Sequence, residues 1–318
     1  MVVTVTVNAA MDRTLLVPNF QVGHRHRASM ALASAGGKGI NVARALKRLG
    51  IPVVASGLAG GRTGTGVVEE LTDEGILNDF VRIRDESRTS VAVLDPISNA
   101  YTEINEWGPQ VGEDEVQMLR DKLSYLTQGA EFVVFAGSLP RGVPPGFYAE
   151  MIREANRREV LTALDTSGEP LQLGVQAGPY LVSPNMREAE GLVGHEFTEE
   201  SDIAAALDEI GGRGARNVLV TVEGGCYALL REHRNELRVR ATAPHLEPVS
   251  VVGSGDTLLA GYIAAHVRGR PVEEILRTAV AAGAASVLEP GAGRFDPREI
   301  GRLSPLVAIE PLTQPAHR

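Results

Sequence analysis

The sequence predicts an α/β fold with a mainly parallel sheet and helices on both of its faces. From about residue 113 onward strands and helices alternate, which is typical of parallel sheets that are covered on both sides. The chain has 318 residues and 43% apolar residues, which suits one large α/β domain or two small ones. Two β-rich segments, near 13–34 and 87–107, interrupt the alternation and predict a separate small sheet.

The first strand is predicted at 2–7, where valine alternates with threonine, and a loop that contains Asp12 follows it at 8–13. The next helix opens at a glycine-rich turn and ends at Gly50. Its apolar residues share one helical face, and three basic residues, Arg44, Lys47 and Arg48, fall away from that face. We therefore expect these basic side chains to point away from the core.

The later elements follow from hydrophobic periodicity and turn residues. They are a strand at 53–58, a helix at 64–75, a hairpin from 88–94 and 101–104, helices near 113–127 and 145–158, strands at 132–136, 160–164 and near 180–182, helices near 186–193 and 200–212, a strand at 217–222, a hairpin near 226–240 and a helix at 273–288.

A glycine-rich loop at 251–257 precedes an apolar run that predicts a helix from Thr257. The glycines let the backbone approach a ligand closely, and the free N–H groups of a helix's first turn attract anions. Asp256 lies inside this loop, where a carboxylate could accept the proton of a hydroxyl that attacks a phosphoryl group. The alternative interpretation is that Asp256 simply caps the helix.

A second glycine-rich turn places Lys38 at the mouth of the helix that follows it. The turn is not a Walker A motif, because Gly39 rather than serine or threonine follows the lysine. Polar residues or glycines also follow several predicted strands directly, at 8–12, 57, 137–138, 165–167, 183–185 and 221–225. Since ligands of open α/β sheets bind beyond the carboxyl ends of the strands, these positions predict one site at that edge.

Composition excludes several classes of function. A net charge of −9 argues against a general nucleic-acid or anionic-membrane surface, so we expect neither partner. Cys226 is the only cysteine, which excludes an intrachain disulfide and makes a cysteine-ligated metal unexpected. No apolar run approaches the ~20 residues of a membrane helix, and the first residues are interpreted as a strand rather than a signal peptide. We therefore expect a cytoplasmic protein.

Three ordered motifs resemble those of the ribokinase-like, or PfkB-type, carbohydrate kinases: Gly36-Gly37-Lys38-Gly39-Ile40-Asn41, Asn185-Met186-Arg187-Glu188 and Gly253-Ser254-Gly255-Asp256. The resemblance spans most of the chain, from Val5 to about Arg294. Further segments, at 7–12, 102–109 and 137–140, are similar to the hexose-phosphate branch of that family, which includes 1-phosphofructokinase, tagatose-6-phosphate kinase and the minor 6-phosphofructokinase.

The resemblance implies a role for each matching position. Asp256 would be the base that deprotonates the sugar hydroxyl, and the N–H groups of Gly253, Ser254 and Gly255 would hold the γ-phosphoryl group. The sugar would be bound by Asp12, Gly37 and Asn41 at its hydroxyls, and by Lys38, Arg88 and Ser138, with Arg25 or Arg27 of a partner's lid, at its phosphate. ATP would lie against Asn185, Thr221, Glu223, Gly224, Gly225 and Gly283, while Asn185 and Glu188 would organise Mg²⁺ through water.

The resemblance also implies an architecture. The chain, 1–318, would form one ribokinase-like three-layer domain, and the inserts at about 13–34 and 87–107 would form a β lid that pairs two chains into a homodimer. Four positions depart from the pattern of the branch: Ser183 replaces a lysine near the ATP phosphates, Glu223 and Cys226 replace glycines, and Ala9 replaces a proline. These departures bear on nucleotide affinity and leave Asp256 untouched.

The resemblance therefore implies an ATP-dependent kinase that converts fructose 1-phosphate to fructose 1,6-bisphosphate. Tagatose 6-phosphate and fructose 6-phosphate are the alternative acceptors, and an unphosphorylated sugar or nucleoside is a third choice that Arg88 argues against. An alternative of another class is a sugar-phosphate-binding protein that has lost catalysis. The sequence leaves these acceptors open, because pocket contacts often discriminate related substrates by only ~1–3 kcal/mol.

Overall fold

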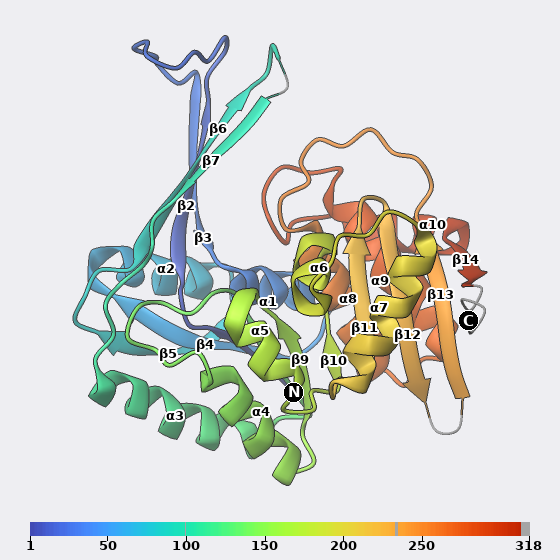
Figure 1. The fold of residues 1–318 in the computed structure, drawn as a ribbon. Coiled ribbons are helices and arrows are strands. Elements are labelled where there is room, and N and C mark those ends of the chain that lie inside the picture. Colours follow the sequence, from blue (N-terminus) through green and yellow to red (C-terminus); the bar gives the residue numbers. More distant parts are fainter. Residues whose placement is uncertain (99, 233–234, 313–318) are drawn as a thin grey trace.

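The computed structural model describes residues 1–98, 100–232 and 235–312. A ten-stranded sheet forms its body, and a four-stranded sheet projects from one side of that body (Figure 1). In spatial order, the large sheet contains β14 (Ala308–Pro311), β13 (Asn235–Thr242), β12 (Gly225–Glu232), β11 (Asn217–Val222), β10 (Leu181–Val182), β9 (Leu161–Asp165), β8 (Phe132–Ala136), β1 (Val2–Thr6), β4 (Val53–Gly60) and β5 (Leu77–Ile83).

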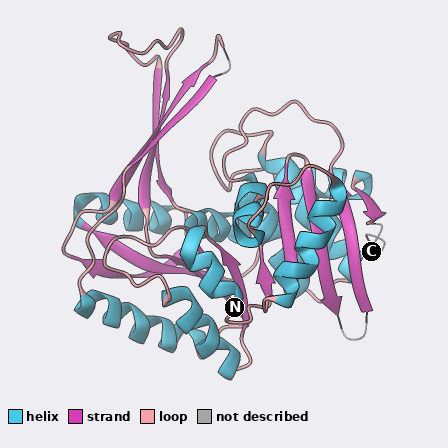
Figure 2. Ribbon diagram, viewed as in Figure 1, coloured by secondary structure: helices cyan, strands magenta, loops and turns pink. Residues whose placement is uncertain are grey.

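In this spatial order, the strands from β11 through β1 to β5 pair in parallel, and β12, β13 and β14 add an antiparallel edge. Helices cover both faces, so the body has three layers (Figure 2). One face packs against α1 (Lys38–Arg48), α2 (Gly61–Asp73), α8 (Ser254–Val267), α9 (Val272–Ser286) and α10 (Pro297–Leu303). The other packs against α3 (Glu113–Thr127), α4 (Phe147–Arg157), α5 (Gly168–Val175), α6 (Met186–Val193) and α7 (Glu200–Gly212).

The core follows from the alternation of side chains along each strand. In β1, Val2 packs into one apolar layer, whereas Val3 and Val5 pack into the layer on the opposite face. Both faces of the central strands are buried, which explains their continuous apolar sequences. None of the helices in the described parts of the chain is long and apolar enough to cross a membrane.

The two β-rich inserts do form a sheet of their own, as predicted. It contains β3 (Met30–Gly36), β2 (Ala10–Leu16), β6 (Arg88–Asp95) and β7 (Ala100–Asn105) in that order. The inserts meet where β2 and β6 run parallel, and β3 and β7 are the outer strands. The alternating body is also confirmed. The prediction omitted β5, α5, α10 and β14, which are peripheral elements of the body or begin with glycine or proline.

Two local expectations were wrong. Asp12 lies in β2 rather than in a loop, because β3 and β6 supply hydrogen-bond partners on both sides of that strand. Arg44 does not point to solvent, since its exposed fraction is only 3%. It is covered by α2 and by the segment 289–296, and the carboxylates of Glu70 and Glu74 compensate its charge there.

Candidate active site

The predicted anion loop is the N-terminus of α8. Gly253 is the N-cap residue with a φ of 77°, a left-handed conformation that glycine adopts without strain. Ser254, Gly255 and Asp256 therefore form the first helical turn, whose N–H groups have no partner within the helix. The amide of Ser254 donates to the carbonyl of Val251 at 3.3 Å, and those of Gly255 and Asp256 follow it at the positive end of the helix dipole.

Asp256 does not cap this helix. Its carboxylate Oδ2 accepts a hydrogen bond from Asn41 Nδ2 at 2.8 Å, and only 6% of the residue is exposed. Asn41 lies in α1, so this contact joins the two glycine-rich turns that the sequence singled out. The oxygen of the same side-chain amide, Asn41 Oδ1, is buried without a hydrogen-bond partner among the described residues. A buried acceptor in this state is suited to a hydroxyl group of a ligand.

The carboxylate of Asp256 lies in an unusual electrostatic setting. Burial and the nearby carboxylate of Asp165 raise the pKa of Asp256 to about 7. Lys38 and the amide of Asn41 act in the opposite direction, because both favour the ionised form. The side chain can therefore gain or lose a proton near neutral pH, as a general base or acid must.

Lys38 lies among several carboxylates. Its ammonium is 2.5 Å from Asp165 Oδ1 and 3.8 Å from Glu188 Oε1. Burial acts to lower the pKa of Lys38, but the charges of Asp165, Asp256 and Glu188 outweigh it and raise that pKa above its ordinary value. Lys38 therefore stays protonated, and it is a fixed positive charge next to the first turn of α8.

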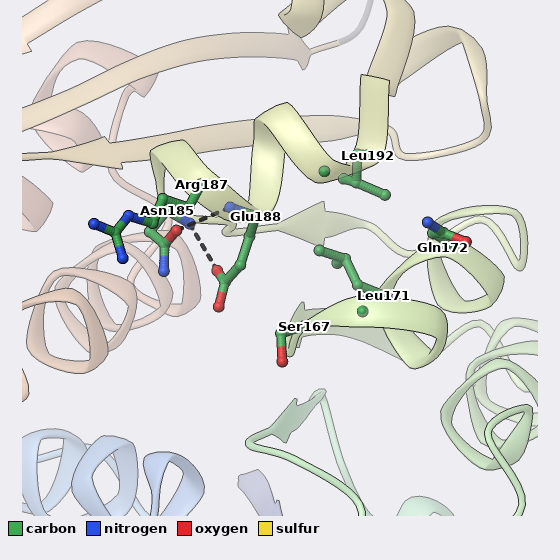
Figure 3. A pocket seen from close by; sticks show the side chains of 9 residues that line it. Ser167, Leu171, Gln172, Asn185, Arg187, Glu188 and Leu192 are labelled. Carbon is green, nitrogen blue, oxygen red and sulfur yellow. Dashed lines mark hydrogen bonds between the residues drawn. The ribbon is translucent and has the colours of Figure 1, made fainter. Parts of the chain in front are cut away.

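Asn185 and Glu188 begin α6 with a reciprocal cap. The backbone amide of Glu188 donates to Asn185 Oδ1 at 3.0 Å, and the amide of Asn185 donates to Glu188 Oε2 at 2.8 Å. Figure 3 shows these two side chains beside Ser167 and Leu171, at a cavity of about 420 Å³ between α5 and α6. Burial raises the pKa of Glu188, and its Oε1 still lies within 3.8 Å of the Lys38 ammonium.

A larger cavity, of about 1150 Å³, opens at the same edge of the sheet. It joins the anion loop to positions that the sequence assigned to a nucleotide, and its lining includes Lys38, Asp165, Asn185, Thr221, Glu223, Gly224, Gly225, Gly253, Ser254, Gly255, Asp256 and Gly283. Ser183 and Arg187 also line it, so an arginine is available near the departure at Ser183. Cys226 is fully buried in the core instead, and burial raises its pKa to about 12.

A second polar group lies where the four-stranded sheet joins the body. Arg88 in β6 donates to the backbone oxygen of Asn8 at 3.3 Å and to Ser90 Oγ at 3.2 Å. Asn8 Nδ2 donates in turn to Ser138 Oγ at 3.1 Å, while Asn8 Oδ1 is buried without a partner among the described residues. Burial raises the pKa of Asp12 in β2, and the charge of Arg88 acts to lower it.

The structure therefore brings most of the predicted residues together. Asp12, Lys38 and Asn41 all influence Asp256 electrostatically or by hydrogen bonding, and Gly37 is the N-cap of the helix that carries Lys38 and Asn41. Arg27 is an exception, since it is exposed in the connection between β2 and β3, at the outer end of the projecting sheet (Figure 1).

The sequence predicts no specific role for Asp165 or Asn8, which the structure places in these two polar groups. Both follow or end a buried strand at the expected edge, and Asn8 also lies in the segment 7–12 that resembles the hexose-phosphate branch.

Comparison with known proteins identifies the family. Residues 3–299 match the pfkB family of carbohydrate kinases. The chain is 32% identical to the 1-phosphofructokinase of Borreliella burgdorferi, over 91% of this chain and 92% of that protein. It is 30% identical to a tagatose-6-phosphate kinase of Staphylococcus epidermidis, over 93% of this chain and 95% of that protein.

The solved structures agree with these sequence matches. Phosphofructokinase-2 of Escherichia coli in complex with fructose-6-phosphate superposes with a TM-score of 0.86 at 28% identity, covering 96% of this chain and 98% of that one. A ribokinase of Arabidopsis thaliana has the same fold, with a TM-score of 0.75 at 22% identity over 95% of this chain and 98% of that one. The chain therefore belongs to the pfkB family of carbohydrate kinases.

Proposed function

We propose that this protein transfers the γ-phosphoryl group of ATP to a hydroxyl of fructose 1-phosphate, which gives fructose 1,6-bisphosphate and ADP. The observation that carries the proposal is the buried carboxylate of Asp256, which lies in the first turn of α8 and has a pKa of about 7. Relatives named 1-phosphofructokinase support this acceptor, and relatives named tagatose-6-phosphate kinase support tagatose 6-phosphate as the alternative.

The chemistry assigned to the site is an in-line phosphoryl transfer. Asp256 accepts the proton of the acceptor hydroxyl as its oxygen forms a bond to the γ-phosphorus, and the bond from phosphorus to the β–γ bridging oxygen breaks, so that ADP leaves. The amides at the start of α8 stabilise the negative charge on the transferring group. Lys38 lines the same cavity as this turn and supplies a positive charge there.

The acceptor would be held by the polar groups at the base of the four-stranded sheet. Asn41 and Asp12 would bind its hydroxyls, since Asn41 Oδ1 is a buried acceptor without a partner among the described residues. Arg88 and Ser138 would bind its phosphate. We propose that the four-stranded sheet acts as the lid over this acceptor and that residues 1–318 form one catalytic domain.

The larger cavity fits a nucleotide in volume and in position. At about 1150 Å³ it exceeds the ~300–1,000 Å³ of most ligand pockets, and it reaches the N-terminus of α8, where phosphate groups bind. ATP would lie against Thr221, the segment 223–225 and Gly283, with Asn185 at its phosphate end.

Mg²⁺ fits the same region. The described residues contain no cluster of three or more His, Cys, Asp or Glu side chains at metal distance, but Mg²⁺ is usually held by one or two carboxylates, waters and substrate phosphates. Asn185 and Glu188 would organise it through water, and it would neutralise charge on the phosphates.

The proposal is tested by measuring ATP consumption with four acceptors: fructose 1-phosphate, tagatose 6-phosphate, fructose 6-phosphate and fructose. We expect fructose 1-phosphate to give the highest kcat/KM and fructose to give at least about tenfold less, because it lacks the group that Arg88 would bind. If tagatose 6-phosphate gives the highest kcat/KM, it would be the acceptor instead of fructose 1-phosphate, and the proposed mechanism would stand. Tight acceptor binding without ATP consumption would favour the non-catalytic alternative.

Replacing Asp256 with asparagine should lower kcat by about 10²–10⁴-fold with smaller changes in KM, because the amide cannot accept the proton. In the parent, kcat/KM should fall as the pH is lowered through about 7, since protonation of Asp256 removes the base. Steady-state rates between about pH 5.5 and 8 measure both effects. An Asp256→Asn variant within a few-fold of the parent would reduce the carboxylate to a structural role.

Replacing Arg88 with alanine should raise KM for the sugar phosphate about 10- to 100-fold, the loss expected for a charge-assisted hydrogen bond of ~1.5–3 kcal/mol. KM for ATP should change less than about twofold, because Arg88 contacts the acceptor group of residues and does not line the large cavity. Arg82→Ala is the matched control, as this exposed arginine contacts Thr65. A rise in KM for ATP instead of KM for the sugar phosphate would assign Arg88 to the ATP site.

We further propose a homodimer formed through the four-stranded sheet. The face of that sheet that carries Asp12 also carries Met30, Leu32 and Tyr101, which are 54%, 52% and 45% exposed. A partner's sheet packed on this face would bury them, and it would bring the partner's Arg-rich connection between β2 and β3 toward the acceptor.

Light scattering during size-exclusion chromatography tests this dimer. Leu32→Asp should give a monomer, because the charge would be buried against the partner sheet. Thr102→Asp is the control, since Thr102 lies on the opposite face of the same sheet and should leave the dimer intact. A Leu32→Asp protein that stays dimeric would place the interface elsewhere.

A further inference from the structure

Arg44 is buried in the middle of α1 although it makes no contact with the large cavity. Its Nε atom lies 2.7 Å from Glu74 Oε2 and 3.0 Å from Glu74 Oε1. The other two nitrogens donate to backbone carbonyls: Nη2 to Ala35 at 3.1 Å and Nη1 to Ala292 at 3.4 Å. One guanidinium thus contacts three separate segments of the chain.

The contact with Ala35 leads to the acceptor side of the site. Ala35 lies in β3 and pairs with Met11 of β2, one residue from Asp12. Its amide donates to Glu70 Oε2 at 2.7 Å, and Glu70 Oε1 lies 3.7 Å from Arg44 Nη2. Both backbone polar groups of Ala35 are therefore held by one network, which fixes the base of the four-stranded sheet against α1 and α2.

The contact with Ala292 leads to the phosphoryl side. A Cβ atom on Gly253 would lie only 2.6 Å from Ala292 Cβ, so the two residues pack as closely as the missing side chain allows. Arg294 holds the same segment from its other end, with Nη2 3.3 Å from Glu74 Oε1. The position of Ala292 therefore determines where Gly253, the N-cap of α8, can lie.

We propose that Arg44 is a positioning residue that fixes the acceptor strands relative to the phosphoryl loop. A buried ion pair is a weak source of stability, because its desolvation offsets its attraction and apolar residues of similar volume often replace it at little cost. The planar guanidinium can make three directed contacts at once, which an apolar side chain cannot do. Its geometry, rather than its charge alone, connects the two halves of the site.

This inference rests on the proposed phosphoryl transfer, in which the acceptor oxygen and the γ-phosphorus must meet at a defined distance. A displacement of about 1 Å can cost about 10²-fold in rate without any lost contact to the reacting atoms. Loosening the bridge at Arg44 should therefore lower kcat more than it changes either KM.

The test compares three variants in the full-length protein. Arg44→Lys keeps the positive charge beside Glu74 and Glu70 but cannot donate to both carbonyls through a planar fork. Arg44→Met removes the charge as well. Arg48→Met is the matched control, because Arg48 lies one turn later in α1 and donates to the carbonyl of Phe295, in the same segment but farther from Gly253.

Three readouts separate positioning from simple loss of stability. We expect kcat of Arg44→Lys to fall about 10- to 100-fold with KM values within about threefold, while Arg48→Met stays within about twofold. Isothermal titration calorimetry with fructose 1-phosphate measures acceptor binding independently of turnover. Amide hydrogen exchange should become about tenfold faster at Ser254 and Thr257, whose amides donate to the carbonyls of Val251 and Gly253, in both Arg44 variants and stay at the parent rate in Arg48→Met.

Unchanged exchange at Ser254 and Thr257 in Arg44→Lys would overturn the bridge, and so would a kcat equal to that of the parent. If Arg44→Met fails to fold, Arg44→Lys still decides. The activity of the parent protein is a separate outcome: if it phosphorylates none of the acceptors, the proposed function fails, and the exchange comparison alone decides whether Arg44 holds the loop.

Discussion

The buried charges around Asp256 constrain the rest of the structure. Asp165 ends a central strand of the sheet, and Lys38 begins α1, so their ion pair joins the sheet to the helix that carries Asn41. Without that cation, three carboxylates would lie close together in a poorly solvated region, at a considerable cost in free energy. The end of the sheet strand that carries Asp165, the turn before α1 and the start of α8 all have to meet at this point.

The same constraint explains how an acidic protein can bind two anionic ligands. A net charge of −9 disfavours phosphates at long range, so attraction has to come from individual cations and oriented amides. Lys38 lies beside Asp165 at the large cavity, which the N-terminus of α8 also lines, and Arg88 lies at the base of the four-stranded sheet. The local field, rather than the total charge, is what the ligands experience.

Much of the fold and much of the candidate site could be predicted from the sequence. Alternating strands and helices indicated the three layers. Short motifs at turns located Lys38, Asn41 and Asp256, because the residues of each motif are neighbours in the chain. What the sequence could not show depended on distant neighbours. The burial of Arg44 requires α2 and the segment 289–296 to cover a face that looks polar by periodicity, and the strand at Asp12 requires pairing with β6, more than seventy residues away.

Two of the residues proposed to bind the acceptor lie in a different part of the architecture from the residues proposed to hold the phosphoryl group. Asp12 and Arg88 lie on strands of the projecting sheet, whereas Asp256 and Lys38 begin helices of the body. Substitutions in the projecting sheet can therefore alter the shape of the acceptor pocket while the phosphate-binding turns stay as they are. In evolutionary terms the fold is modular. The same phosphate-binding turns can act on different sugars when the side chains of the projecting sheet change.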